Sequence, residues 1–90
     1  MKNQVEVLEY AKRAFIEEHY SAKIYEHLAH AFKNNKSVSS KFKEIAQMER
    51  RHAGFWNSFL KKRGVYMEGF HVNKSLLRLK VFNIDYSVLR

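Results

Sequence analysis

Cysteine and proline are absent from the chain, and glycine occurs only three times. Without cysteine, the protein has no disulfides, thiolate metal sites, iron–sulfur clusters or thiol-based catalysis. The scarcity of proline and glycine argues against a loop-rich or many-turned all-β fold. These absences favour an all-helical protein.

Long apolar runs are missing as well. A membrane-spanning helix needs about 20 apolar residues, and no segment approaches that length. The first ten residues contain no secretory hydrophobic stretch. We therefore expect a cytoplasmic protein without a membrane span. The chain has 90 residues, which is enough for one domain at most. Its hydrophobic content of 46% is too high for a disordered chain. A lone monomer of this size would be only marginally stable.

The net charge is +8, and the last 30 residues carry +5 of it. A basic tail can bind nucleic acid or an anionic surface. The simpler interpretation, which we favour, is a solvated basic face.

Helix-boundary signals divide the chain into segments. Asn3 begins an N-x-x-E pattern with Glu6, which is typical of a helix start. The stretch 34–37, Asn-Asn-Lys-Ser, combines residues that end helices with a serine that caps starts. Three cations followed by Gly64 indicate a second helix end. We predict helices over about 4–33 and 38–63, joined by a short connection that makes them antiparallel neighbours.

The last part of the chain is less regular. Residues 64–73 are predicted to form a loop, followed by a short third helix with Leu77, Val81, Ile84 and Val88 on one stripe. Residues 82–88 also alternate as a strand would, but such a strand has no visible partner. The predicted organisation is therefore a helical hairpin over 1–63 and a loop with a C-terminal helix over 64–90.

Apolar residues recur at alternating steps of three and four in both long helices, which is typical of the seam of a helical bundle. The seam positions are Leu8, Ala11, Phe15, Glu18, Ala22, Tyr25, Ala29 and Phe32, then Val38, Phe42, Ile45, Glu49, His52, Trp56 and Phe59. Three of these are neither apolar nor aromatic: Glu18, Glu49 and His52. A carboxylate in a bundle core is unfavourable by roughly several kcal/mol unless it is paired or bound to metal.

The three polar seam residues are predicted to meet. Glu18 lies 17 residues before a turn centred near residue 35, and His52 lies 17 residues after it. Glu49 is three residues before His52, on the same helix face. All three should therefore lie within about one helical turn of the same level, some 5 Å along the axis. A buried Glu–His ion pair with the second Glu solvated is the alternative interpretation.

Two carboxylates and an imidazole are ligands for iron, manganese or zinc. Di-iron sites in bundles use one Glu from each of two helices and a Glu-x-x-His from each of the other two. This chain has one Glu and one Glu-x-x-His, which is half of that set. A second copy would supply the rest and would bury the apolar seam. We therefore expect a homodimer, or a larger assembly of dimers, that forms a four-helix bundle and holds two metal ions per dimer.

These residues also resemble a known family. The pattern of Glu18, Tyr25 to Ala29, residues 45–52 (Ile-Ala-Gln-Met-Glu-Arg-Arg-His) and Trp56 is similar to the first half of a rubrerythrin-like ferritin-family domain. The closest likeness is to the ferritin-like domain joined to vacuolar-iron-transporter-type membrane proteins. The resemblance covers residues 8–62 well and 74–90 weakly, where residues 77–82 resemble the start of that domain's third helix.

The resemblance implies a di-iron site with Glu18, Glu49 and His52 as ligands, and oxidation of ferrous iron by oxygen or peroxide. The second Glu and the second Glu-x-x-His of the family are absent here, as is any transporter. The short encapsulated ferritins are similar in having one hairpin per chain and a site at the dimer interface. Because the chain lacks cysteine, a peroxidase cycle would need an outside reductant.

Other residues near the predicted site are not expected to be metal ligands, but some are candidates for supporting roles. Tyr25 is a candidate second-sphere donor or electron relay, although core packing is the interpretation we favour. Trp56, four residues after His52, is expected to shield the site from water. Glu17 should be solvated, but would compete with Glu18 if the first helix were rotated by one position. His27 and His30 are expected on a solvated face, with a surface metal-entry site as the alternative.

Three functions follow from these observations. The favoured one is a ferritin-like di-iron protein that acts as a ferroxidase or a rubrerythrin-like peroxidase. A basic helical dimer that binds nucleic acid is the second. The third is metal storage or sensing without turnover.

Overall fold

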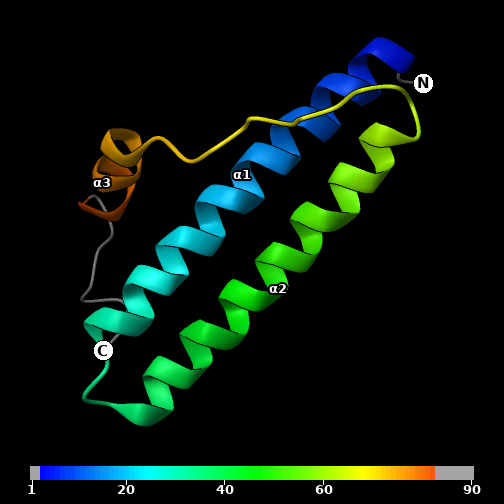
Figure 1. Ribbon diagram of the computed structural model, residues 1–90. Helices are drawn as coiled ribbons and strands as arrows, with labels where there is room; N and C mark the ends of the chain where they lie inside the picture. Colours follow the sequence, from blue (N-terminus) through cyan, green and yellow to red (C-terminus); the bar gives the residue numbers. More distant parts are fainter. Residues whose placement is uncertain (1–2, 83–90) are drawn as a thin grey trace.

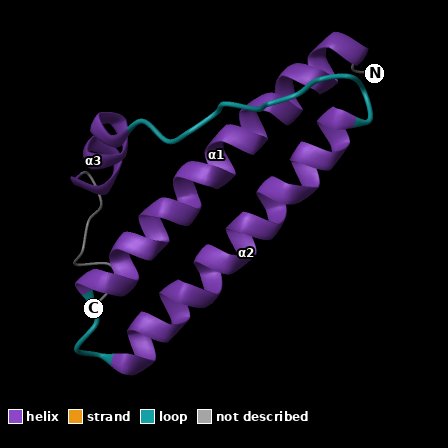
Figure 2. Ribbon diagram, in the orientation of Figure 1, coloured by secondary structure: helices purple, strands orange, loops and turns teal. Residues whose placement is uncertain are grey.

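The computed structural model describes residues 3–82, and within them it contains three helices and no strand (Figures 1 and 2). Helix α1 spans Gln4–Ala31, α2 spans Lys36–Lys61 and α3 spans Lys74–Phe82. The two long helices run antiparallel as a hairpin, which confirms the predicted all-α architecture. The short α3 packs only against α1 among these helices.

Helix α1 begins where the sequence predicts. The side chain of Asn3 accepts a hydrogen bond from the Glu6 backbone N–H at 2.9 Å, and its amide donates to the Glu6 carboxylate at 3.3 Å. This reciprocal cap satisfies a donor that the first turn leaves free. The helix ends at Ala31, two residues before the predicted end, and Phe32 forms its C-cap.

Helix α2 begins two residues earlier than predicted. Asn35 caps it, because its side chain accepts a hydrogen bond from the Val38 N–H at 3.2 Å. At the other end, Val65 N–H donates to the Leu60 carbonyl and Gly64 N–H donates to the Lys61 carbonyl. These two bonds form a Schellman motif, and Gly64 adopts the positive φ of 76° that the motif requires.

The hairpin core consists of two apolar clusters at opposite ends of the helices. One is built on Ala11, Phe15 and Leu60, and the other, near the turn, on Leu28, Ala29 and Phe42. Between them, the fully buried Ala46 and Ala53 of α2 allow the two helices to approach closely. The α2 residues buried against α1 therefore lie one helix position away from most of the predicted seam. Ile45, Trp56 and Phe59 of that seam are only partly buried.

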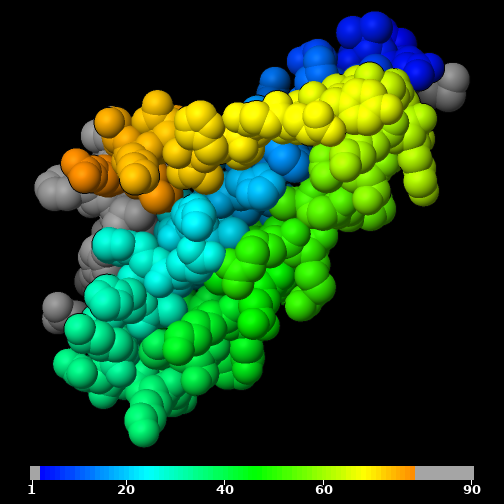
Figure 3. Space-filling model, in the orientation of Figure 1, coloured from blue at the N-terminus to red at the C-terminus, as the bar shows by residue number. Residues whose placement is uncertain are grey.

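Residues 64–73 form the predicted loop and run back along α1 (Figure 3). The Phe70 ring lies 5.4 Å from Phe15 and 6.4 Å from Tyr20, between ring centroids. Asn73 N–H donates to the Tyr20 hydroxyl at 3.0 Å, and the Asn73 side chain accepts from Leu76 N–H at 2.9 Å. The same asparagine thus attaches the loop to α1 and starts α3.

Helix α3 confirms that a third helix begins after the loop, as predicted. Ile84 and Val88 of the predicted stripe, and residues 83–88 of the alternative strand, lie outside the described residues. Within residues 3–82, no helix combines the length and apolar character that crossing a bilayer requires.

Candidate metal centre

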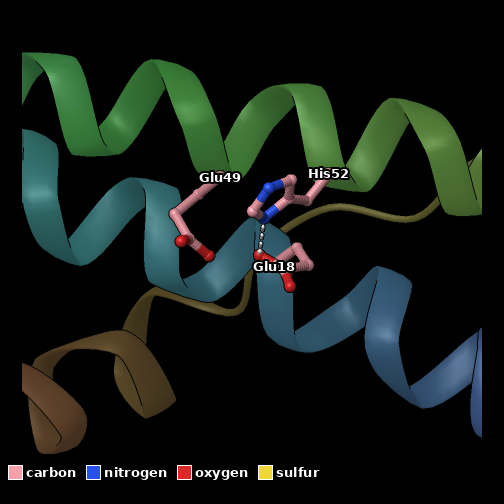
Figure 4. A group of neighbouring side chains, drawn as sticks. All are labelled: Glu18, Glu49 and His52. Atoms are coloured by element: carbon pink, nitrogen blue, oxygen red, sulfur yellow. Dashed lines mark ion pairs between the residues drawn. The ribbon is translucent and has the colours of Figure 1, made fainter.

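Glu18, Glu49 and His52 converge in the middle of the hairpin (Figure 4). Glu18 comes from α1, while Glu49 and His52 come from successive turns of α2. One ligand atom from each side chain can be chosen so that all three atoms lie within 4.8 Å of one another. The three polar seam residues that the sequence singles out are therefore neighbours in space, as the turn position predicts.

One carboxylate oxygen of this group lacks a hydrogen bond. His52 Nδ1 lies 3.6 Å from Glu18 Oε2, which is close enough for an ion pair but too long for a hydrogen bond. Glu18 Oε2 is buried and has no hydrogen-bond partner among the described residues. The Glu18 side chain is 24% exposed and that of His52 is 50% exposed. A buried oxygen without a hydrogen bond is unfavourable by roughly 1–3 kcal/mol, so this atom has unused capacity to bind a cation.

Glu49 holds its proton unusually well. The neighbouring Glu18 carboxylate, to which a protonated Glu49 can donate, is the largest cause, and burial and the negative charge of Glu18 add to it. Together they raise the pKa of Glu49 from 4.5 to about 7, although His52 opposes the shift. Two carboxyl groups this close cannot both ionise freely. In the metal-free protein near neutral pH, Glu49 is therefore partly protonated, and a bound cation would displace this proton.

The donor set fits a transition metal such as iron. Two carboxylates and one imidazole match the ligand types of ferrous iron, and also suit manganese or zinc. The unpartnered Glu18 oxygen and the raised pKa of Glu49 both belong to two neighbouring, partly buried carboxyl groups that have little positive charge beside them. A divalent cation would supply that positive charge.

Contacts between the site and the turn hold the register of the hairpin. Arg50, next to Glu49, forms an ion pair with Glu26 of α1, and Lys23 also pairs with Glu26. Nearer the turn, the buried Ser39 hydroxyl donates to the Ala29 carbonyl at 2.7 Å. These contacts fix the level at which Glu49 and His52 meet Glu18.

The other predicted residues lie further from the site. Tyr25 packs in the cluster near the turn, with its ring 6.0 Å from Phe42. Trp56 lies one turn beyond His52 and packs against the opposite cluster. Glu17 lines a groove between α1 and α3, away from Glu49 and His52. His27 and His30 are exposed, and the neighbouring Glu26 is already paired with Arg50 and Lys23.

An apolar face surrounds the site on the side of the hairpin that neither helix covers. We call it the open face. It comprises Tyr10 on α1 and Ile45, Met48, Phe55, Trp56 and Phe59 on α2, with Glu49 and His52 among them. Tyr10 is 54% exposed, Met48 40% and Phe55 60%. The Trp56 ring contacts those of Tyr10 and Phe55 at centroid distances of 5.5 and 5.0 Å.

The sequence interpretation missed three members of this face. Tyr10, Met48 and Phe55 each lie one position away from a predicted seam residue, so they were not counted among the seam positions. For Phe55, the spacing of three residues from His52 and four from Phe59 was the available signal, since side chains three or four residues apart share a helix face.

The fold and the site together define a class of protein. An antiparallel helix pair that carries one glutamate on its first helix and Glu-x-x-His on its second is half of a ferritin-like carboxylate bundle. The Rubrerythrin family model matches residues 6–87, and the chain belongs to this ferritin-like di-iron family, whose members typically bind iron. No curated protein and no solved structure gives a significant match.

Proposed function

We propose that the protein binds iron through Glu18, Glu49 and His52 and oxidises ferrous iron with oxygen or peroxide. The convergence of these three side chains within 4.8 Å, around a buried carboxylate oxygen that lacks a hydrogen bond, is the observation that carries the proposal. Membership of the rubrerythrin family supports iron as the metal. Manganese or zinc would suit the same donors.

Each of the three side chains has a distinct task in this proposal. Glu49 releases its proton when a cation binds, which restores the carboxylate as a ligand. Glu18 offers the oxygen that has no hydrogen bond in the metal-free protein, and His52 offers a ring nitrogen. Ferrous iron is the substrate and gives up one electron per ion, so two ions together supply the two electrons that reduce peroxide to water or oxygen to peroxide. Carboxylates suit this change because they can bind an ion through one or both oxygens.

A second copy of the chain completes the site in our proposal. One hairpin provides two carboxylates and one histidine, whereas a two-iron site in a bundle uses twice that number. The open face surrounds Glu49 and His52 and leaves large apolar side chains in water. A two-fold dimer would cover this face and would bring both sets of ligands together. We place this dimer in the cytoplasm, and larger assemblies of dimers are compatible with it.

An anaerobic titration with ferrous iron tests the proposal. Native mass spectrometry and metal analysis should find two ions per dimer, and oxygen admitted afterwards should be consumed as ferric iron forms. Glu17→Ala is the matched control, because Glu17 lies next to Glu18 but outside the site. A folded monomer with and without metal would refute the shared site, and failure to bind ferrous iron would refute the metal site itself.

The two other functions make different predictions in this experiment. Iron storage or sensing without turnover would give stoichiometric binding but no oxygen uptake. Nucleic-acid binding through the basic tail would leave the purified protein without metal. We do not favour it, since Arg63, one of the tail cations, stacks on the Phe59 ring and donates to the Phe59 carbonyl.

A further inference from the structure

We propose that α2 recognises α2 of a second copy in one antiparallel register, in which Glu49 lies opposite the partner's His52. The inference deepens the proposed function and rests on it for the identity of the partner. It specifies which surface the two copies share and how they are aligned. The spacing of residues along α2 and their exposure support this alignment.

The open-face stripe of α2 has a symmetrical spacing. Its positions are 45, 49, 52 and 56, separated by steps of four, three and four. The midpoint of this stripe falls between residues 50 and 51. In an antiparallel pair centred there, Glu49 lies opposite the partner's His52, and Ile45 lies opposite the partner's Trp56. Each polar residue thus meets a polar residue, and each apolar residue meets an apolar one.

The polar pair selects this register over its neighbours. A shift by one heptad in one direction would place Glu49 against the partner's Ile45, and a shift in the other direction would place it against the partner's Phe59. Either shift leaves a carboxylate buried against apolar groups, which is strongly unfavourable. Polar residues within an apolar helix interface are known to fix register in this way.

The same pair also favours the antiparallel orientation. In a parallel two-fold dimer with the helices in register, Glu49 would lie opposite the partner's Glu49, which places two like charges together. In the antiparallel dimer, each Glu49 instead meets an imidazole. The exposed flank of the stripe also favours the antiparallel orientation. Met48 is 40% exposed and Phe55 is 60% exposed, and Met48 of one copy would lie at nearly the same level as the partner's Phe55. Contacts between a thioether and an aromatic ring are favourable.

Cross-linking between introduced cysteines tests the register, because the chain has no cysteine of its own. The double variant Ile45→Cys/Trp56→Cys, treated with a short bismaleimide in metal-free buffer, should give mainly covalent dimers. The two positions are about 16 Å apart within one helix, so an intrachain link is not expected. Each single variant should remain monomeric on a denaturing gel. The reason is that position 45 and its symmetry mate, like position 56 and its own, would also be about 16 Å apart along the axis.

The matched control reports the shifted register. Val38→Cys/Trp56→Cys places the two thiols opposite each other only if the helices slide by one heptad. This variant should cross-link at least tenfold less than Ile45→Cys/Trp56→Cys. Equal or stronger cross-linking of the control overturns the proposed register. Absence of cross-links in both variants, with helical circular dichroism retained, overturns recognition through α2.

A spin label at an exposed position keeps the test independent of core substitutions. Phe55→Cys changes a side chain that is 60% exposed, so the hairpin should stay folded. The two labels of a dimer should be separated by about 14 Å along the axis in the proposed register, against about 24 Å and about 3 Å in the two shifted registers. A distance matching either shifted register, or no dipolar coupling, overturns the inference.

The result is separable from the outcome for the proposed function. Cross-linking and spin-label distances need no metal, whereas ferrous oxidation does. Register-specific cross-links without ferrous oxidation would refute the ferroxidase proposal and leave this interface standing. Ferrous oxidation together with cross-links only in the shifted control would refute this interface and leave the ferroxidase proposal standing.

Discussion

His52 Nδ1 of α2 lies 3.6 Å from Glu18 Oε2 of α1, so the two helices meet near their midpoints through a polar contact beside the buried Ala46 and Ala53. This contact lies between the two apolar clusters of the hairpin. Glu49 completes the group, with a pKa raised to about 7 by the neighbouring Glu18 carboxylate and by burial. The centre of the hairpin therefore contains polar groups that lack full compensation, and a bound cation there would stabilise the folded protein.

Replacing any one of the three proposed ligands should remove ferrous oxidation. We expect Glu18→Ala, Glu49→Ala and His52→Ala to reduce oxygen uptake with ferrous iron to the background rate, because each change removes a ligand twice in a symmetric dimer. Glu17→Ala and His27→Ala should retain parental rates, since both residues lie outside the group. Activity retained in all three ligand variants would show that iron is oxidised elsewhere.

The stability of the metal-free protein should fall as the pH rises from about 4.5 to about 7. The pKa of Glu49 is raised in the folded protein from 4.5 to about 7, so the folded state binds this proton more tightly than the unfolded chain. The resulting stabilisation is fully present below pH 4.5 and is lost as the pH rises through the folded-state pKa. After allowance for solvent screening at a partly exposed group, we expect a loss of about 1 kcal/mol.

Chemical denaturation at a series of pH values, with a chelator present, measures this loss. Glu49→Gln should flatten the dependence, because its amide has no proton to lose. Glu44→Gln is the matched control, since Glu44 is an exposed carboxylate of the same helix. Should Glu49→Gln keep the full pH dependence, another group would be responsible.

Much of the fold could be predicted because its signals are local. Asn3, Gly64 and the three-four periodicity act through neighbouring residues, and the structure confirms the helix start, the Schellman end and the hairpin. The start of α2 was predicted two residues late, because Ser37 and Asn35 are both good caps and only the backbone shows which one is used. The hydrogen bond between Tyr20 and Asn73 joins two residues that are 53 positions apart in the sequence, and no local sequence pattern predicts it.

The site was predictable in its members but not in its surroundings. Glu18, Glu49 and His52 stood out because polar residues interrupt an apolar stripe, and the turn position placed them at one level. The burial of Ala46 and Ala53 was not predicted, since alanine contributes little to an apolar pattern. That burial rotates α2 so that His52 is half exposed, which depends on the packing of both helices together.

Removal of the α2 cap should destabilise the hairpin by about 1 kcal/mol. Asn35→Ala loses the side-chain oxygen that accepts the Val38 N–H at 3.2 Å, and this N–H has no partner within the first turn of the helix. Asn34→Ala is the matched control, because Asn34 is exposed and precedes the cap. Urea denaturation should separate the two variants, and an equal loss in both would point to the connection rather than the cap.

Metal should decide whether the parent or its glutamate variants are more stable. In the metal-free protein, Glu18→Ala and Glu49→Ala should be as stable as the parent or more stable. Each change removes one of two carboxyl groups that repel each other, and Glu18→Ala also removes a buried oxygen that has no hydrogen bond. The loss of these unfavourable contributions offsets the destabilisation caused by the small cavity that each substitution leaves. Functional groups in such clusters often reduce stability in this way.

The parent should recover its advantage only when metal is present. Binding to the folded state alone adds about 2.7 kcal/mol at a free metal concentration of 100 times Kd, and variants that lack a ligand cannot gain it. Thermal melts of the parent and both variants, with chelator and then with ferrous iron under anaerobic conditions, measure the difference. Loss of several kcal/mol by both metal-free variants would instead make the glutamates structural partners of His52, because removing one member of a stabilising buried pair leaves the other charge uncompensated.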